Sequence, residues 1–240
     1  MLFRSLGGVC VPPCYVSEAH GYIGKKLSVN TVIGYPNGYA TAETKVFECK
    51  NAIKNGACEI EMFPNIGYIK KRRYDMLQYE IAAVRKAAKK RTLKLIIDTT
   101  MLTDGEQIAA CTVASSMHVD YITVSCSHGF ETLVADVKRL QDNLGYGMKI
   151  KAYGCVESLE NAKYFADIGV SQIGVKKICG DAVVSPEDGI NPEIIAPSDD
   201  YIPKSSDCTK KKDQPQVTEE SDEPAIDVLV TEPEQTESAE

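Results

Sequence analysis

The stretch TLKLIIDTTMLTDGEQIAACTVASSMHVDYITVSC, residues 92–126, decides the fold class. It opens with a largely aliphatic run at 92–98, which is typical of a strand buried on both faces. Thr103 and Glu106 then have the spacing of a capping box and predict the start of a helix. A second β-branched run at 121–127 predicts the next strand. The stretch is therefore one strand–helix–strand unit.

The same alternation continues through most of the chain. Strands are predicted at residues 8–11, 28–34, 58–64, 92–98, 121–127, 148–154 and 171–175. Amphipathic helices lie between them, one with Leu77, Ile81, Val84 and Ala88 on one face. Because the repetition lacks the glycine fingerprint of dinucleotide-binding proteins, it favours a (β/α)8 TIM-type barrel over an open doubly wound sheet. Seven strands, not eight, are visible.

The charge is divided unevenly along the chain. Residues 186–240 hold 16 acidic residues, four lysines and seven of the eleven prolines, which gives this segment a net charge of −12. Residues 1–185 have a net charge of +5. A segment with so little apolar surface cannot offset its ordering entropy. We therefore expect a barrel domain at 1–185 and a disordered acidic tail at 186–240.

Composition excludes two classes of protein. No run approaches 18 apolar residues, so a membrane-spanning helix is not expected. The nine cysteines form no close framework, which indicates reduced thiols. Since the first residues also lack a signal-like segment, we expect a cytoplasmic protein.

Lys151 is the most informative candidate for the active site, which barrels of this type build at the carboxyl ends of their strands. It lies inside an apolar strand, where a lysine is costly unless it is paired. Glu61 and Asp98 are the available partners. These three residues are read either as a structural ion-pair network or as an amine and acids placed for carbonyl chemistry.

Four motifs make the chain recognisable: TVIGYPNG at 31–38, CEIEMFPNIG at 58–67, LKLIIDTTMLTD at 93–104 and IKAYGCVESLENA at 150–162. In this order they resemble deoxyribose-phosphate aldolase of the compact bacterial type. The resemblance implies a (β/α)8 barrel and class I chemistry, in which a lysine Schiff base cleaves 2-deoxyribose 5-phosphate without a metal or other cofactor. The family's first strand and helix would precede Met1, so we expect a barrel that lacks its first β/α unit.

The resemblance also identifies departures from the family's site. Thr123 occupies the position of the Schiff-base lysine, and the chain has no other lysine between Lys94 and Lys138. Lys151 matches the second active-site lysine, and Glu61 stands where the family has an aspartate. For phosphate binding, the resemblance points to Gly154 and to Lys176 and Lys177, which replace serines, while Cys155 replaces a glycine beside Gly154.

These departures predict a pseudoenzyme. A threonine hydroxyl cannot form an imine, so we expect retro-aldol activity to be lost or impaired, with the barrel retained for binding a sugar phosphate or a protein. One alternative is an active aldehyde-lyase in which Lys151 forms the imine while Glu61 and Asp98 transfer protons. Another is a structural module of a larger assembly.

Nine basic residues fall within residues 70–91. They are read as a solvated helix face or as a surface for a phosphorylated ligand, a nucleic acid or an acidic protein. No RNA-binding motif accompanies them, so nucleic acid is not expected. We therefore predict that any protein partner binds through this basic face or through the acidic tail.

Overall fold

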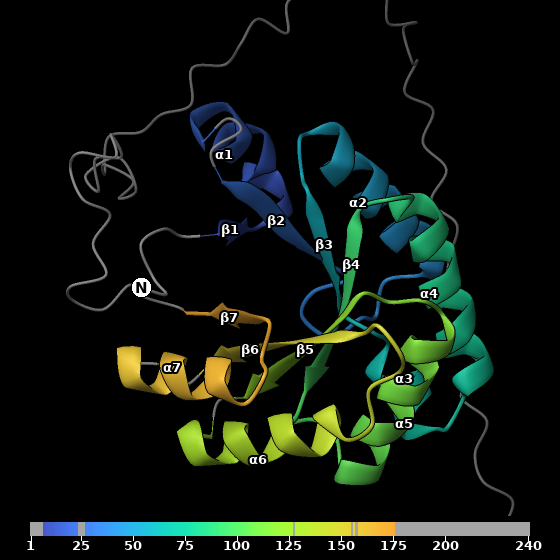
Figure 1. The fold of residues 1–240 in the computed structure, drawn as a ribbon. Helices are drawn as coiled ribbons and strands as arrows, with labels where there is room; N and C mark the ends of the chain where they lie inside the picture. Colours follow the sequence, from blue (N-terminus) through green and yellow to red (C-terminus); the bar gives the residue numbers. More distant parts are fainter. Residues whose placement is uncertain (1–6, 24–26, 127, 155, 157, 176–240) are drawn as a thin grey trace, which may run out of the picture. The chain divides into compact units, whose positions relative to one another are not determined.

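The computed structural model describes residues 7–23, 27–126, 128–154, 156 and 158–175. These residues form a curled parallel sheet with helices on its outer side, an α/β fold of the TIM type (Figure 1). The strands are β1 (Gly8–Val11), β2 (Ser28–Ile33), β3 (Glu59–Met62), β4 (Thr92–Asp98), β5 (Tyr121–Cys126), β6 (Lys149–Gly154) and β7 (Gln172–Gly174). They pair in chain order, and among the described residues no pairing joins β1 to β7.

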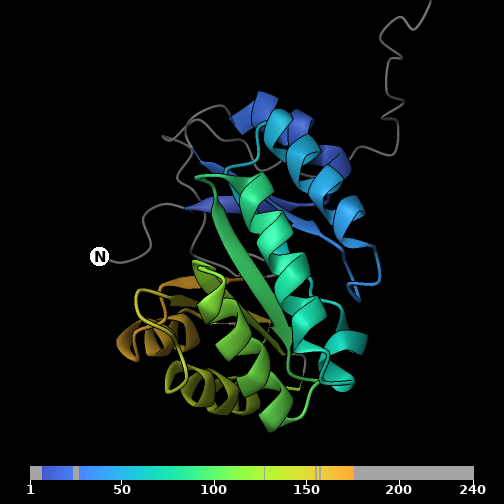
Figure 2. The ribbon, with the colours of Figure 1, turned by 90° about the vertical axis from the view of Figure 1, so that its right-hand side faces the viewer.

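Helices connect consecutive strands, as right-handed βαβ units require. They are α1 (Val16–Ile23), α2 (Ala42–Lys54), α3 (Ile66–Lys70), α4 (Tyr74–Ala88), α5 (Asp104–Ser116), α6 (Phe130–Gln141) and α7 (Leu159–Asp167), with a short 3-10 turn at Pro13–Tyr15. Figure 2 shows α2 and α4 side by side on the outside of the sheet. None of the described helices combines the length and apolar composition that a membrane span requires.

The predicted strands are confirmed to within two residues at each end. The predicted caps are confirmed as well. The backbone N–H of Thr103 donates to Glu106 Oε2 at 2.8 Å, and Ser158 Oγ accepts the N–H of Asn161 at 3.1 Å. Local sequence therefore sets the start of α5 and of α7.

The core lies between the sheet and the helix layer. Leu77, Ile81 and Val84 of α4 are fully buried, as their spacing predicts. Successive strand residues point to opposite faces, so β4 divides into two sets. Leu93, Leu95 and Ile97 belong to one face, and Lys94, Ile96 and Asp98 belong to the other. This second face is the inner side of the curled sheet.

A buried ion pair lies beside the loop that follows β3. Lys45 Nζ lies 2.7 Å from Glu80 Oε2, and Glu80 Oε1 accepts the backbone N–H of Asn65 at 2.8 Å. Burial raises the pKa of Glu80 and lowers that of Lys45, while their mutual attraction opposes both shifts. The pair therefore ties α2 and α4 to the loop that follows β3.

Several predicted features lie outside the described residues. They are Cys155, Lys176 and Lys177, together with the acidic segment at 186–240. The division of the chain into a domain at 1–185 and a tail remains a prediction.

Candidate active site

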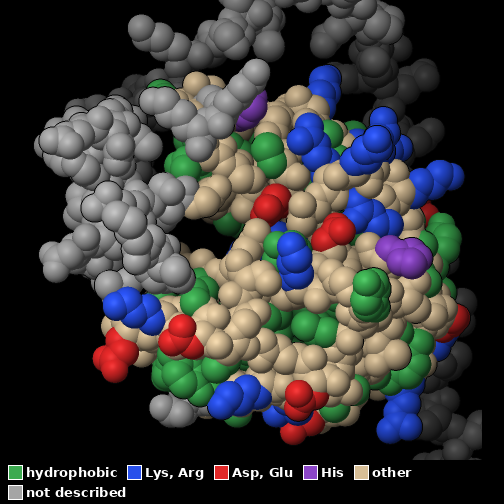
Figure 3. All heavy atoms as spheres, in the orientation of Figure 1, with side chains coloured by type: hydrophobic (Ala, Val, Ile, Leu, Met, Phe, Trp, Pro, Cys, Tyr) green, Lys and Arg blue, Asp and Glu red, His purple; other side chains and the backbone are tan. Residues whose placement is uncertain are grey.

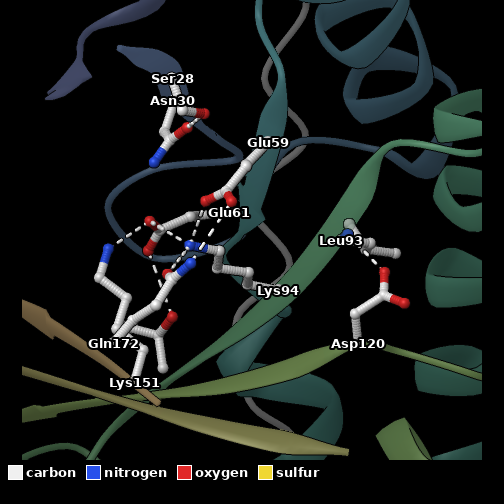
Figure 4. A network of polar contacts seen from close by, with 10 residues as sticks. Ser28, Asn30, Glu59, Glu61, Leu93, Lys94, Asp120, Lys151 and Gln172 are labelled. Carbon is white, nitrogen blue, oxygen red and sulfur yellow. Dashed lines mark hydrogen bonds and ion pairs between the residues drawn. The ribbon is translucent and has the colours of Figure 1, made fainter. Parts of the chain in front are cut away.

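Strand alternation brings charged side chains onto the inner side of the sheet. Glu59 and Glu61 are two residues apart on β3, so they point the same way. Lys94 pairs in register with Glu61 on the next strand, and Lys151 pairs in register with Thr123. Figure 4 shows the carboxylates and amines meeting between β3 and β7.

Glu61 lies at the centre of this network. Its Oε1 forms an ion pair with Lys151 Nζ, and its Oε2 accepts a hydrogen bond from Thr123 Oγ1 at 3.2 Å. All three side chains are buried: Glu61 is 3% exposed, Thr123 2% and Lys151 7%. The structure therefore brings together three of the four catalytic positions that the sequence indicates.

Asp98 is placed elsewhere. It ends β4, four residues beyond Lys94 and thus roughly 13 Å farther along the strand. Its Oδ1 accepts hydrogen bonds from the N–H and the hydroxyl of Thr100, at 2.9 and 2.6 Å. Within the described part of the chain no ion pair joins Asp98 to Lys151, so only Glu61 has the predicted partnership.

Lys94 is a member of the network that sequence reasoning missed. It is fully buried, and its Nζ lies 2.5 Å from Glu59 Oε2 and 3.7 Å from Glu61 Oε1. It also donates to Gln172 Oε1 on β7. The rule that selects Lys151, a lysine inside an apolar strand, applies equally to Lys94 in TLKLIID.

The network is balanced in formal charge. Two lysines, Lys94 and Lys151, face two glutamates, Glu59 and Glu61. Buried ions are tolerated when each has a counter-ion and hydrogen bonds satisfy the remaining atoms. Both amines are therefore held by carboxylates, and the uncharged hydroxyl of Thr123 completes the cluster.

Gly154 is a glycine for a reason of packing. It ends β6 with a φ of +130°, and a Cβ at this position would lie 2.1 Å from the carbonyl oxygen of Cys126. Any side chain would clash with the backbone of β5. This close approach requires glycine whether or not a phosphate binds there.

The thiol of Cys10 responds to the same charges. Burial raises the pKa of Cys10 to about 11, and the negative charge of Glu61 adds to this shift. Lys151 acts in the opposite direction. Although Cys10 keeps an exposed surface, its thiol thus lies within electrostatic reach of the network.

We expect iodoacetamide to alkylate Cys10 about ten times faster for each pH unit between pH 8 and pH 10, because only the thiolate reacts and its fraction grows tenfold per unit below the pKa. Peptide mass spectrometry measures the rate, and Cys10→Ser identifies the peptide. Lys151→Met removes the cation that favours the thiolate, so it should slow the reaction. A rate that levels off below pH 9 would contradict the raised pKa.

Sequence comparisons find deoxyribose-phosphate aldolases as relatives of this chain. The chain is 40% identical over 176 residues to the deoxyribose-phosphate aldolase of Clostridioides difficile (strain 630), covering 73% of this chain and 80% of that protein. It is 42% identical over 172 residues to the deoxyribose-phosphate aldolase of Streptococcus pyogenes serotype M4 (strain MGAS10750), covering 70% and 76%. No family model matches the chain.

The fold also resembles solved structures of aldolases. The structure of QR15, an aldolase, superposes with a TM-score of 0.66 at 27% identity and covers 72% of this chain and 78% of its own. The deoxyribose phosphate aldolase from Aeropyrum pernix superposes with a TM-score of 0.61 at 21% identity and covers 76% of each chain. The second likeness concerns the fold alone.

Proposed function

Because this chain belongs to the deoxyribose-phosphate aldolase family, we propose that it is a member in which retro-aldol cleavage of 2-deoxyribose 5-phosphate is lost or severely impaired. One contact carries the proposal. Thr123 stands where the family resemblance expects the Schiff-base lysine. Its hydroxyl donates a hydrogen bond to Glu61 Oε2 at 3.2 Å. A hydroxyl has no amine to condense with an aldehyde, so the covalent route has no starting point there.

The environment of Lys151 supports the same conclusion. To form an imine, this amine must lose its proton and present a lone pair to the substrate aldehyde. Its Nζ is instead engaged by the carboxylate of Glu61, and that of Lys94 is engaged in the same way by Glu59. We therefore prefer loss of activity to an aldolase that uses Lys151 as its nucleophile.

A retained role in binding a sugar phosphate fits the rest of the proposal. Lys176 and Lys177 would supply positive charge to the phosphate, and Gly154 would let the backbone approach it closely. The buried polar groups of Glu61 and Thr123 would face the hydroxyls of the sugar. In this role the barrel acts as a sensor or scaffold for its ligand and does not turn it over.

The test is borohydride trapping with 2-deoxyribose 5-phosphate, read by intact mass and by peptide mass spectrometry. We expect no substrate-derived adduct, while the Clostridioides difficile relative, trapped in parallel, is modified. Calorimetric titration with the same sugar phosphate should still show binding. An adduct on Lys151 would replace our proposal with the active-enzyme alternative. Neither adduct nor binding would favour a purely structural module.

A further inference from the structure

The basic stretch at residues 70–91 falls into two groups. Helix α4 separates its two halves, and fifteen helical residues span about 22 Å. At the first end, Lys70 pairs with Glu106 at 2.7 Å and Arg73 pairs with Asp75 at 3.1 Å. The two ends of α4 therefore have different surroundings, and the prediction of a partner surface at 70–91 is considered for each end separately.

The second end of α4 meets the end of α2 and forms a hollow of about 620 Å³. We call it the basic hollow and define it by its lining residues: Lys50, Ile53, Lys54, Ala87, Ala88, Lys89, Lys90 and Arg91. Figure 3 shows Lys and Arg side chains gathered over this region, at the upper right. Five of the eight lining residues are cationic and none is acidic.

The five cations of the basic hollow have no counter-ions among the described residues. Their neighbour Arg85 differs, since it pairs with Asp120 at 2.7 Å and donates to the carbonyls of Lys89 and Arg91. Arg85 thus holds the turn after α4 in shape. The side chains that surround the hollow remain available to a ligand.

Helix stabilisation explains only part of this arrangement. A cation in the last turn of a helix interacts favourably with the macrodipole, which accounts for Lys54 at the end of α2. Lys89, Lys90 and Arg91 follow the end of α4, in the connection to β4, where that effect falls off. Unpaired cations that repel one another around one hollow indicate a binding surface for an anion.

The floor of the hollow selects among anions. Ile53, Ala87 and Ala88 are aliphatic, and no aromatic side chain lines the hollow. Single-stranded nucleic acids gain affinity by stacking their bases on aromatic side chains, which this floor does not offer. Ala87 and Ala88 are buried, whereas Ile53 is partly exposed, so a short aliphatic side chain can pack against Ile53 while acidic neighbours reach the rim.

We propose that the basic hollow binds an acidic protein segment that carries a short aliphatic stretch between its acidic residues. The carboxylates pair with Lys89, Lys90 and Arg91, and the aliphatic stretch packs against Ile53, which is partly exposed. This surface belongs to the outer helix layer, so the binding does not depend on the chemistry of the inner network.

The test uses the full chain and a fluorescein-labelled peptide of twelve residues, in which Val-Leu-Val is flanked by glutamates, with fluorescence anisotropy as the readout. Lys89→Glu with Lys90→Glu should weaken binding at least tenfold. The matched control is Lys71→Glu with Arg72→Glu at the other end of α4. It makes the same change in charge, also at two exposed adjacent positions of which one has a positive φ. Its affinity should equal that of the wild type.

Two further probes separate charge from packing. A peptide with glutamine in place of glutamate should lose binding, and a peptide with serine in place of the aliphatic centre should bind more weakly. Equal loss of affinity in both double variants would overturn the assignment to this hollow. Tighter binding of a twelve-nucleotide single strand would overturn the choice of a protein ligand, and so would failure of the acidic peptide to bind.

Discussion

Thr123→Lys is expected to give the chain an imine-forming amine that can be trapped on 2-deoxyribose 5-phosphate. The new amine would lie beside Glu61 and Lys151, because Thr123 contacts the first and pairs in register with the second. A third lysine gives the inner network a formal charge of +1, and repulsion among cations favours loss of a proton from one of them. The neutral amine can then condense with the aldehyde and release water.

The expected readout is a borohydride-reduced adduct at position 123 and a retro-aldol rate at least about a hundredfold above that of the wild type. Thr123→Met is the matched control, since it adds a side chain of similar length without an amine. Adding Lys151→Met to the lysine variant tests whether the neighbouring cation is needed. A folded Thr123→Lys chain without adduct would show that more than the nucleophile has been lost.

Glu61→Leu is expected to destabilise the chain by about 3–5 kcal/mol, because it leaves Lys151 without its counter-ion and Lys94 with one carboxylate fewer. Urea unfolding measures the loss as a lower midpoint with an unchanged slope. The exposed substitution Glu18→Leu is the control and should change the free energy of unfolding by less than about 0.5 kcal/mol.

A double-mutant cycle separates the network from simple packing. Glu61→Leu combined with Lys151→Met removes both charges, so it should be more stable than Glu61→Leu alone. If Glu61→Leu lowers the free energy of unfolding by less than about 1 kcal/mol, groups other than Glu61 stabilise the charge of Lys151. The same conclusion would follow if the losses in free energy of unfolding of the two single variants added up to that of the double variant.

The order of the elements follows from local sequence, but the composition of the site does not. Short apolar runs between helical patterns locate the seven strands of the described sheet. The caps at Thr103 and Ser158 locate two helix starts. Pattern alone identifies Lys151 as a buried amine. The identity of its neighbours depends on which strands pair and in which register, information that a single strand does not carry.

At two places, closeness in the sequence does not bring side chains together in space. Asp98 and Lys94 share a face of β4, but the extended strand separates them, and Asp98 bonds to its own loop. The basic residues at 70–91 look continuous in the sequence, whereas the length of α4 divides them. In both cases the rise per residue of the element decides which groups meet.

The strands of this sheet pair in the order in which the ribosome makes them. Glu59, Glu61 and Lys94 emerge first, Lys151 and Gln172 emerge later, and Gln172 then meets a partner 113 residues behind it. A nascent chain that ends before β6 thus carries both glutamates of the inner network but one of its two lysines. The network is short of one positive charge until Lys151 arrives, so its charge balance is reached only when β6 has been made.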